Sequence, residues 1–519
     1  MTGSAICCKG MLPMNHPSCG ILLHLTSLPS SYGIGTLGQA AYDFVDFLRD
    51  AGQSCWQILP IGPTGYGDSP YQSFSTFAGN PYLIDLDFLI QDVLLTQAEV
   101  DEITWGARAD QVDFALLYRQ RLPILRKAYE RFRVAPAADF GAFCDTESDW
   151  LENYALFMAL KGHFGGGAWT EWPSEFQRRE PEALAWARGA LAEEIDFHQF
   201  LQYQFYRQWH RFRAYTRQKG VTLMGDIPIY VPLDSADFWC RPEQFQVDMH
   251  GRPTCVAGCP PDGFSAEGQY WGNPIYDWDA MARDGFAWWM RRIGAAGRLF
   301  DVIRIDHFRG IESYWSIPAD SDTAKNGRWV KGPGKALIDA IRSHFPHLAF
   351  VAEDLGFLTE DVLELVKESG FPGMKVLEFA FDPGEESAYL PHRYPRNCVC
   401  YTGTHDNATL PQWCQESDGA VTDCARDYLH LSRQDDLARN LLRRGLASKA
   451  DLFIAQMQDY LGLGGDARMN EPGTLKPENW RWRVTREQLT PTLAHTLRTL
   501  AKEAGRLPDY ETQERTVYE

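Results

Sequence analysis

Short apolar runs rich in β-branched and aromatic residues recur along the chain. Amphipathic helical patterns separate the later runs, as at residues 334–344 and 359–369. A repeated unit of strand and helix is typical of a parallel sheet, because the helix carries the chain back to the start of the next strand. We therefore predict seven parallel strands, at residues 20–25, 55–61, 221–230, 302–308, 348–355, 374–379 and 399–404.

The acids that end four of these runs favour a closed barrel over an open doubly wound sheet. An open nucleotide-binding sheet needs a glycine-rich phosphate turn after its first strand, and the sequence has none there. Asp226, Asp306, Glu353 and Asp406 stand at or just beyond the ends of separate runs. In a barrel these ends meet around one mouth, where active sites are built. The sequence predicts an α/β fold, a (β/α)8 TIM barrel with the four acids at its mouth.

The strand pattern stops for about a hundred residues after the second run and then resumes with the same character. We assign residues 83–197 to a mostly helical inserted subdomain beside the barrel mouth. The barrel then comprises residues 18–82 and 198–519. Residues 1–17 fit none of these units, and we expect them to form a flexible N-terminal extension.

Charge and cysteine content narrow the partners and the compartment. The 50 Lys and Arg residues against 69 Asp and Glu give a net charge of −19, with no basic stretch that could follow a phosphate backbone. Nucleic acid and anionic membrane are therefore excluded as partners. The 12 cysteines are dilute and follow no repeating spacing, and no apolar run is long enough to cross a bilayer. We expect reduced thiols and a soluble, cytoplasmic protein.

The string V-I-R-I-D-H-F places an Arg–Asp pair at the end of a predicted strand. Side chains alternate along a strand, so Arg304 and Asp306 share one face. A guanidinium in that position can hold a carboxylate ionised and oriented. The alternative is an ion pair with a purely structural role.

Two further segments supply carboxylates at strand ends. In F-V-A-E-D-L-G, Glu353 and Asp354 face opposite ways, so only Glu353 is expected to point to the centre, while Asp354 caps a loop or helix. In T-G-T-H-D-N, the His405–Asp406 pair fits a metal ligand set, a capping element or a hydrogen-bonded turn. Together, a carboxylate nucleophile, a carboxyl acid/base and a third carboxylate are the equipment for cleaving a glycosidic bond with retention.

The sequence resembles glycoside hydrolase family 77, the 4-α-glucanotransferases called amylomaltases or disproportionating enzymes. The likeness runs in order from residue 18 to residue 407, and the strings R-M-N-E-P-G and E-N-W extend it to residue 480. The other matching strings are S-C-G-I-L-L-H-L-T-S-L-P, G-Y-G-D-S-P-Y-Q-S-F-S-T-F-A-G-N-P-Y-L-I-D, M-G-D-I-P-I-Y-V, P-P-D-G-F-S-A-E-G-Q-Y-W-G-N-P, R-I-D-H-F-R-G, A-E-D-L-G and T-G-T-H-D-N.

The resemblance implies an activity and roles for the acids. It implies a double-displacement transfer of α-1,4-glucan segments, without cofactor or metal, among maltooligosaccharides and glucans derived from starch or glycogen. Asp306 would be the nucleophile, Glu353 the acid/base and Asp406 the transition-state stabiliser. Arg304 would keep Asp306 ionised, and His405 would bind ring hydroxyls.

Five further residues match the family's substrate-binding positions. Residues 260–274 resemble the family's active-site loop over the cleft. Trp271, in this loop, would stack on a sugar ring, unless it only packs the base of the loop. Asp226 would contact sugar or serve the structure of the strand end. Tyr71, Ser69 and Asn470 are weaker candidates, since Gly- and Pro-rich strings also suit turns.

Three rival functions remain open on the sequence. A metal-dependent hydrolase would use the imidazoles beside Asp306 and Asp406, although such barrels usually carry a His-x-His pair on the first strand and this one offers only His24. A non-catalytic glucan-binding protein could use the aromatic residues alone. A retaining α-glucan hydrolase shares every catalytic group and differs only in accepting water.

Overall fold

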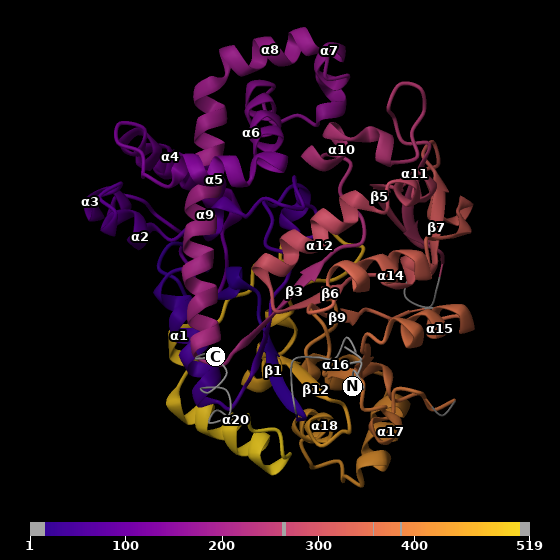
Figure 1. Ribbon diagram of the computed structural model, residues 1–519. Helices are drawn as coiled ribbons and strands as arrows, with labels where there is room; N and C mark the ends of the chain where they lie inside the picture. The colour runs from indigo at the N-terminus through magenta and orange to yellow at the C-terminus, as the bar shows by residue number, and fades with distance from the viewer. Residues whose placement is uncertain (1–15, 262–265, 357, 385–386, 509–519) are drawn as a thin grey trace, which may run out of the picture.

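The computed structural model describes residues 16–261, 266–356, 358–384 and 387–508, so most of the predicted N-terminal extension and part of the 260–274 loop lie outside the described residues. Its centre is an eight-stranded parallel sheet in the order β10-β11-β12-β1-β2-β3-β6-β9 (Figure 1). The strands are β1 (Ser18–Leu22), β2 (Cys55–Gln57), β3 (Thr222–Ile227), β6 (Val302–Ile305), β9 (Ala349–Ala352), β10 (Gly373–Val376), β11 (Cys398–Tyr401) and β12 (Leu452–Gln456).

The sheet closes on itself between β9 and β10. The Ala352 N–H donates to the Pro372 carbonyl at 2.9 Å, and the Met374 N–H donates to the Asp354 carboxylate at 2.6 Å. The predicted barrel is confirmed, and each of the seven predicted strands overlaps one of its eight. Strand β12 was not predicted, because its short run L-F-I-A-Q reads equally as helix or strand and leads directly into helix α19 (Met457–Leu461).

Amphipathic helices cover the outside of the barrel. Two of them, α14 and α15, match the predicted ranges to within one residue. In α15 the Thr359 side chain caps the first turn, and Gly370 ends the helix in the left-handed conformation (φ 72°). No helix in the described ranges has the length and apolarity that a membrane span requires. The outer helices include α1 (Gln39–Asp50), α12 (Ala287–Leu299), α14 (Lys335–His344), α15 (Glu360–Ser369), α16 (Leu410–Glu416), α17 (Gly419–Leu429), α18 (Leu437–Leu446) and α20 (Pro491–Glu503).

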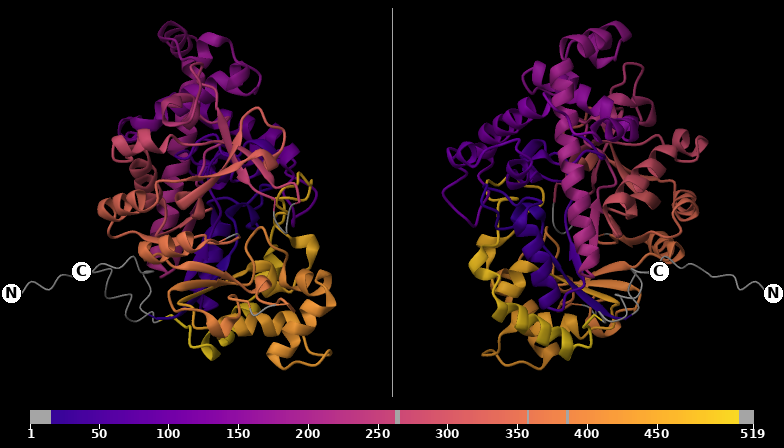
Figure 2. Two further views of the ribbon diagram at one scale, coloured as in Figure 1. Left: turned by 90° about the vertical axis from the view of Figure 1, so that its right-hand side faces the viewer. Right: turned by 60° about the vertical axis from the view of Figure 1, so that its left-hand side comes forward.

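Between β2 and β3 the chain leaves the barrel for a helical insertion. Residues 83–197, all of them described, contain helices and no β-strand. The helices are α2 (Leu86–Gln91), α3 (Gln97–Asp101), α4 (Phe114–Phe132), α5 (Phe140–Thr146), α6 (Ser148–His163), α7 (Ser174–Gln177) and α8 (Pro181–Ala190). Figure 1 shows α6, α7 and α8 at the top of the view, beyond the barrel, and α2 and α3 at its left side; the two views of Figure 2 show the same end of the molecule.

The long helix α9 (Ala192–Gln218) joins the insertion to the barrel. It runs through residue 197 without a break, and Figure 1 shows it reaching from the inserted helices down to α1. Its Tyr215 hydroxyl donates to the Asp46 carboxylate of α1 at 2.8 Å. The insertion therefore rests on a helix that is also part of the barrel wall.

A second, antiparallel sheet stands beside the barrel, in the order β5-β4-β7-β8. This second sheet was not predicted from the sequence. Strand β8 is largely exposed, and β4 reads C-V-A-G-C, without the alternation of apolar and polar residues that marks a half-buried strand. Strand β5 forms the second part of the predicted active-site loop. The strands are β4 (Cys255–Cys259), β5 (Gln269–Pro274), β7 (Ser313–Pro318) and β8 (Arg328–Lys331).

Candidate active site

The four acids lie at the carboxyl ends of barrel strands, as predicted. Asp226 is the penultimate residue of β3, while Asp306 and Glu353 directly follow β6 and β9. Asp406 lies in the turn after β11. Strands β3, β6 and β9 are neighbours, so three of the acids share one arc of the rim.

Arg304, on β6, binds two of these acids at once. Its Nη1 lies 2.5 Å from Asp226 Oδ2 and 2.9 Å from Asp306 Oδ1. The side chains of Arg304 and Asp226 are 4% and 0% exposed, whereas that of Asp306 is 27% exposed. Of the two carboxylates, only that of Asp306 is open to a ligand in the mouth, and Asp226 lies beneath it.

Backbone N–H groups fix the Glu353 carboxylate. Its Oε2 accepts from the His307 N–H at 2.7 Å, and its Oε1 accepts from the Leu355 N–H at 2.8 Å. His307 itself has a positive φ of 51°, in the left-handed region that few residues other than glycine adopt. Asp354 points away, to the start of β10, as predicted for the residue beside Glu353. Glu353 is held next to the residue that follows Asp306.

The pKa values of Asp306 and Glu353 are both raised. Burial is the main cause for each, and Arg304 opposes it. The ion pair with Arg304 acts to lower the pKa of Asp306, which is the predicted direction, and that Arg304 holds Asp306 ionised stays a prediction. Burial, together with the negative charges of Asp226, Glu353 and Asp406, outweighs one shared guanidinium.

Asp406 is held by groups from a different part of the chain. The Asn470 Nδ2 donates to Asp406 Oδ1 at 2.6 Å, and His405 Nε2 lies 3.4 Å from the same oxygen. Burial lowers the pKa of His405, which favours the neutral imidazole. The Arg468 guanidinium donates to the Asp406 carbonyl at 2.7 Å. Two of the predicted residues, His405 and Asn470, thus orient a third.

Tyr71 connects the two halves of the cluster. Its hydroxyl donates to Asp226 Oδ2 at 2.8 Å, and its ring stacks on the His405 ring, with centroids 5.1 Å apart and planes at 17°. The Ser69 hydroxyl accepts from the Tyr71 N–H at 3.3 Å. Ser69 therefore shapes the turn that presents Tyr71, which is the turn role considered for this string.

We expect Tyr71→Phe to lower kcat/KM about 10–100-fold, since a hydrogen bond to a charged group contributes about 1.5–3 kcal/mol. The stacked ring remains, but Asp226 loses one of its two side-chain partners. Steady-state kinetics on maltotriose measure the effect. Tyr215→Phe is the matched control, because it removes a Tyr–Asp bond on the outer wall. Equal losses in both variants would contradict a role for Tyr71 at the mouth.

Trp271, on β5, reaches the cluster from the second sheet. Its ring meets the His307 ring edge to face, with centroids 4.8 Å apart and planes at 85°. Its indole N–H donates to Gln269 Oε1 at 3.0 Å. The Trp271 side chain is partly exposed beside the residue that follows Asp306. The structure thus brings Trp271 to the same mouth as the acids.

Sequence reasoning missed three contributors to this site. The His307 N–H acts through the backbone, which leaves no mark on residue type. Arg468 and Trp480 lie in the strings that pointed to Asn470, but only Asn470 was singled out. The Trp480 ring packs 5.9 Å from that of His405 and 6.1 Å from that of Tyr71. The tryptophan in the string E-N-W was the available signal for Trp480.

The described part of the chain offers no ligand set for a metal-dependent hydrolase. No three of its His, Cys, Asp or Glu side chains are arranged to hold an ion. His405 is committed to Asp406, and the His307 ring packs against Trp271. Burial lowers the pKa of His307 to about 3, so this imidazole is neutral. The geometry is that of a carboxylate cluster with one guanidinium.

Comparisons with known proteins agree with this geometry. The family described as 4-alpha-glucanotransferase, glycoside hydrolase family 77, matches residues 23–490. A 4-alpha-glucanotransferase of Streptococcus pneumoniae is 48% identical over 487 residues, which cover 93% of this chain and 96% of the relative. That of Thermus thermophilus is 47% identical over 500 residues, covering 94% and 99%.

A solved structure has the same fold. The amylomaltase of Streptococcus agalactiae, determined in complex with acarbose, superposes with a TM-score of 0.92 at 40% identity. The superposition covers 95% of this chain and 100% of that one. The resemblance read from the motifs is confirmed: the chain belongs to the 4-α-glucanotransferases of glycoside hydrolase family 77, the amylomaltases.

Proposed function

We propose that this 4-α-glucanotransferase transfers α-1,4-glucan segments by a retaining double displacement, with Asp306 as nucleophile and Glu353 as acid/base. The observation that supports this most directly is the placement of the two carboxyl groups. They follow adjacent strands, β6 and β9, and the residue after Asp306 donates its N–H to Glu353. Retention by a covalent intermediate needs two carboxyl groups that act on one anomeric carbon.

In the first half-reaction, Asp306 attacks the anomeric carbon of the donor sugar. The bond from that carbon to the glycosidic oxygen breaks, and the proton of Glu353 goes to that oxygen. Burial raises the pKa of Glu353, which favours the protonated form that a general acid needs. We assign Asp406 to stabilise the positive charge that develops on the ring, with Asn470 and His405 orienting it.

In the second half-reaction, the ionised Glu353 takes the proton from the 4-hydroxyl of the incoming glucose or glucan. The resulting oxygen attacks the anomeric carbon, the ester bond to Asp306 breaks, and Glu353 regains its proton. Attack by water instead gives hydrolysis through the same groups. We propose transfer as the main outcome, with Arg304 orienting Asp306 throughout.

We propose maltooligosaccharides and α-1,4-glucans derived from starch or glycogen as substrates. The acarbose complex of the Streptococcus agalactiae relative supports an oligosaccharide ligand for this fold. Placement in the cytoplasm is a further part of the proposal. It is supported by the ten described cysteines, all of which are free thiols, as expected under reducing conditions.

Incubation with maltotriose, followed by separation of the products, tests the reaction. Transfer gives glucose and longer maltodextrins, whereas hydrolysis gives only glucose and maltose. The assay is repeated with a chelator, and we expect no change in rate. Loss of activity with the chelator would favour the metal-dependent rival, and binding without products would favour the glucan-binding rival.

We expect Trp271→Ala to slow transfer to a sugar acceptor about tenfold more than it slows formation of the covalent intermediate. The expectation rests on aromatic stacking against the incoming ring, which is used only in the second step. Burst kinetics with a glycosyl fluoride separate the two steps. Tyr270→Ala is the control, since Tyr270 is the preceding residue of β5 and 45% exposed. Equal losses in both steps would show that Trp271 only packs the loop.

A further inference from the structure

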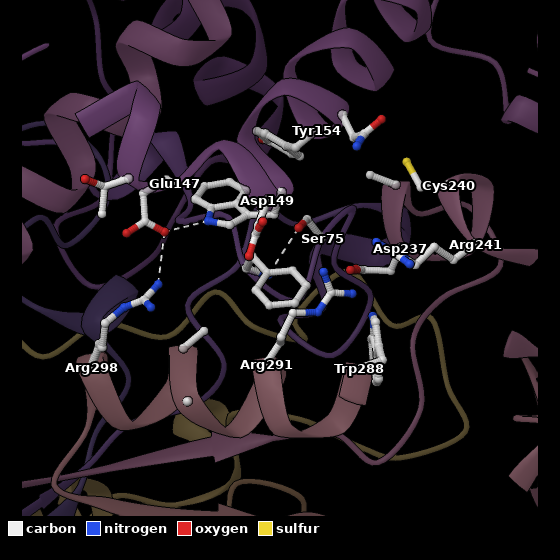
Figure 3. Close-up of a pocket in the computed structure, with 17 residues that line it drawn as sticks. Ser75, Glu147, Asp149, Tyr154, Asp237, Cys240, Arg241, Trp288, Arg291 and Arg298 are labelled. Carbon is white, nitrogen blue, oxygen red and sulfur yellow. Dashed lines mark hydrogen bonds and ion pairs between the residues drawn. The ribbon is translucent and has the colours of Figure 1, made fainter. Parts of the chain in front are cut away.

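A cavity of about 220 Å³ lies between the helical insertion and the barrel wall. Figure 3 shows its three sides: α12 with Arg291, Arg298 and Trp288, the start of α6 with Glu147 and Asp149, and α10 (Ala236–Cys240) with its neighbour Arg241. None of the three proposed catalytic acids lines it. Its size is below that of a typical drug-binding pocket and suits a ligand of about one sugar unit.

Two of the three arginines that line this cavity are unpaired. Arg298 donates to Glu147 Oε2 at 2.9 Å, and the same oxygen accepts from the Trp150 indole N–H at 2.7 Å. Among the described residues, the guanidinium of neither Arg241 nor Arg291 has a hydrogen-bond or ion-pair partner. These two guanidiniums therefore have free donors at the cavity.

The unpaired guanidiniums also repel each other. Burial is the main cause that lowers the pKa of Arg291, and the positive charge of Arg241 adds to it. Asp149 and Asp237 oppose the shift from opposite sides of the cavity, as Figure 3 shows, without an ion pair to Arg291. An anion between Arg241 and Arg291 would relieve the repulsion and use their fork of donors, which matches phosphate geometry.

The rest of the lining suits hydroxyl groups and an apolar ring face. Asp237 is buried, and its Oδ2 accepts from the Thr76 N–H at 2.7 Å. Its carboxylate and that of Asp149 can accept from hydroxyls that a bare phosphate lacks. Phe77 and Trp288 add aromatic carbon to the wall, against which the C–H face of a sugar can pack.

We propose that this cavity is a second ligand site, which binds a hexose phosphate. The phosphate group lies between Arg241 and Arg291, and the sugar hydroxyls face Asp149 and Asp237. A neutral sugar leaves the two guanidiniums unpaired, and inorganic phosphate leaves the carboxylates and the aromatic wall unused. The lining matches a ligand that carries both a phosphate group and a sugar ring. This site is separate from the glucan site at the barrel mouth.

Isothermal titration of the full-length protein tests the proposal with four probes: glucose 1-phosphate, glucose 6-phosphate, inorganic phosphate and glucose. We expect at least one hexose phosphate to bind with a submillimolar Kd, at least tenfold more tightly than phosphate or glucose. Arg291→Gln should weaken that binding at least tenfold. Arg439→Gln, an exposed arginine on α18, is the charge-matched control and should leave it unchanged.

A second variant and a turnover assay complete the test of the hexose phosphate site. Arg241→Gln, at an exposed position, repeats the test if Arg291→Gln does not fold. Both variants should turn over maltotriose at the wild-type rate, which separates this site from the mouth. The proposal is overturned if inorganic phosphate or glucose binds as tightly as the hexose phosphates, if maltotriose competes with them, or if none of the probes binds at 10 mM (about the Kd limit of titration). It is also overturned if both arginine variants bind like the wild type.

Discussion

Asp306→Asn is expected to abolish glucan transfer and leave the barrel folded. An amide cannot form the glycosyl ester, so the loss should be on the order of 10⁴–10⁶ in kcat, the scale seen when an enzyme loses its nucleophile. The fold should persist, because Arg304 keeps its 2.5 Å contact with Asp226 and the Asp306 side chain is partly exposed. Maltotriose disproportionation and the thermal unfolding midpoint are the two measurements.

Asp354→Asn is the matched control for this experiment. Asp354 is also a buried acid beside the cluster, but its carboxylate accepts from the Met374 N–H, and an asparagine oxygen can do the same. We expect it to retain activity within a few-fold of the wild type. An Asp306→Asn variant that keeps more than about a hundredth of the activity would contradict the nucleophile assignment, since that loss is far below the expected scale.

The barrel could be read from the sequence because its strands are buried on both faces. Strands such as V-I-R-I and A-F-V-A are buried along their whole length, and their sequences are therefore the short apolar runs from which strands can be predicted. The second sheet lacked that signal. Strand β8 is exposed, and β4 pairs with β5 and β7 from both sides through contacts that only the folded chain makes.

The acids of the site could be predicted because strand ends converge in any parallel barrel. Their orientation could not, because it depends on groups distant along the chain: Asn470 reaches Asp406 across 64 residues, and Tyr71 reaches Asp226 across 155. The direction of the pKa shift of Asp306 could not be predicted from the local sequence either. The pair with Arg304 was visible in R-I-D, and the convergence of the other three acids was predicted, but the burial that is the largest cause of the shift was not.

Glu353→Gln is expected to stop transfer from ordinary maltodextrins while leaving attack by Asp306 intact. Glutamine cannot give a proton to the leaving oxygen, so turnover should fall by about 10²–10⁴, the usual contribution of a general acid. A maltosyl fluoride needs little protonation of its leaving group and should still glycosylate Asp306. One equivalent of fluoride should then be released in a burst, with no further turnover, because no base activates the acceptor.

Azide is the control for this variant, since it attacks without a general base. It should restore turnover of the fluoride donor and give a maltosyl azide of retained configuration. Mass spectrometry of the trapped enzyme should place the sugar on Asp306. Near wild-type turnover of maltodextrins, or the sugar on another residue, would show that the roles of the two acids are wrongly assigned.

The pH profile of the wild type and of Glu353→Gln should differ on one limb. In the wild type, activity falls at low pH as Asp306 takes up a proton and at high pH as Glu353 loses one. Burial raises the pKa of both groups, so the whole bell is displaced toward higher pH than free carboxylic acids would give. With a glycosyl fluoride, Glu353→Gln should keep the acid limb, because Asp306 still has to be ionised, and lose the alkaline limb, because no acid remains to deprotonate. An alkaline limb that persists in the burst rate of the variant would mean that a group other than Glu353 supplies the proton.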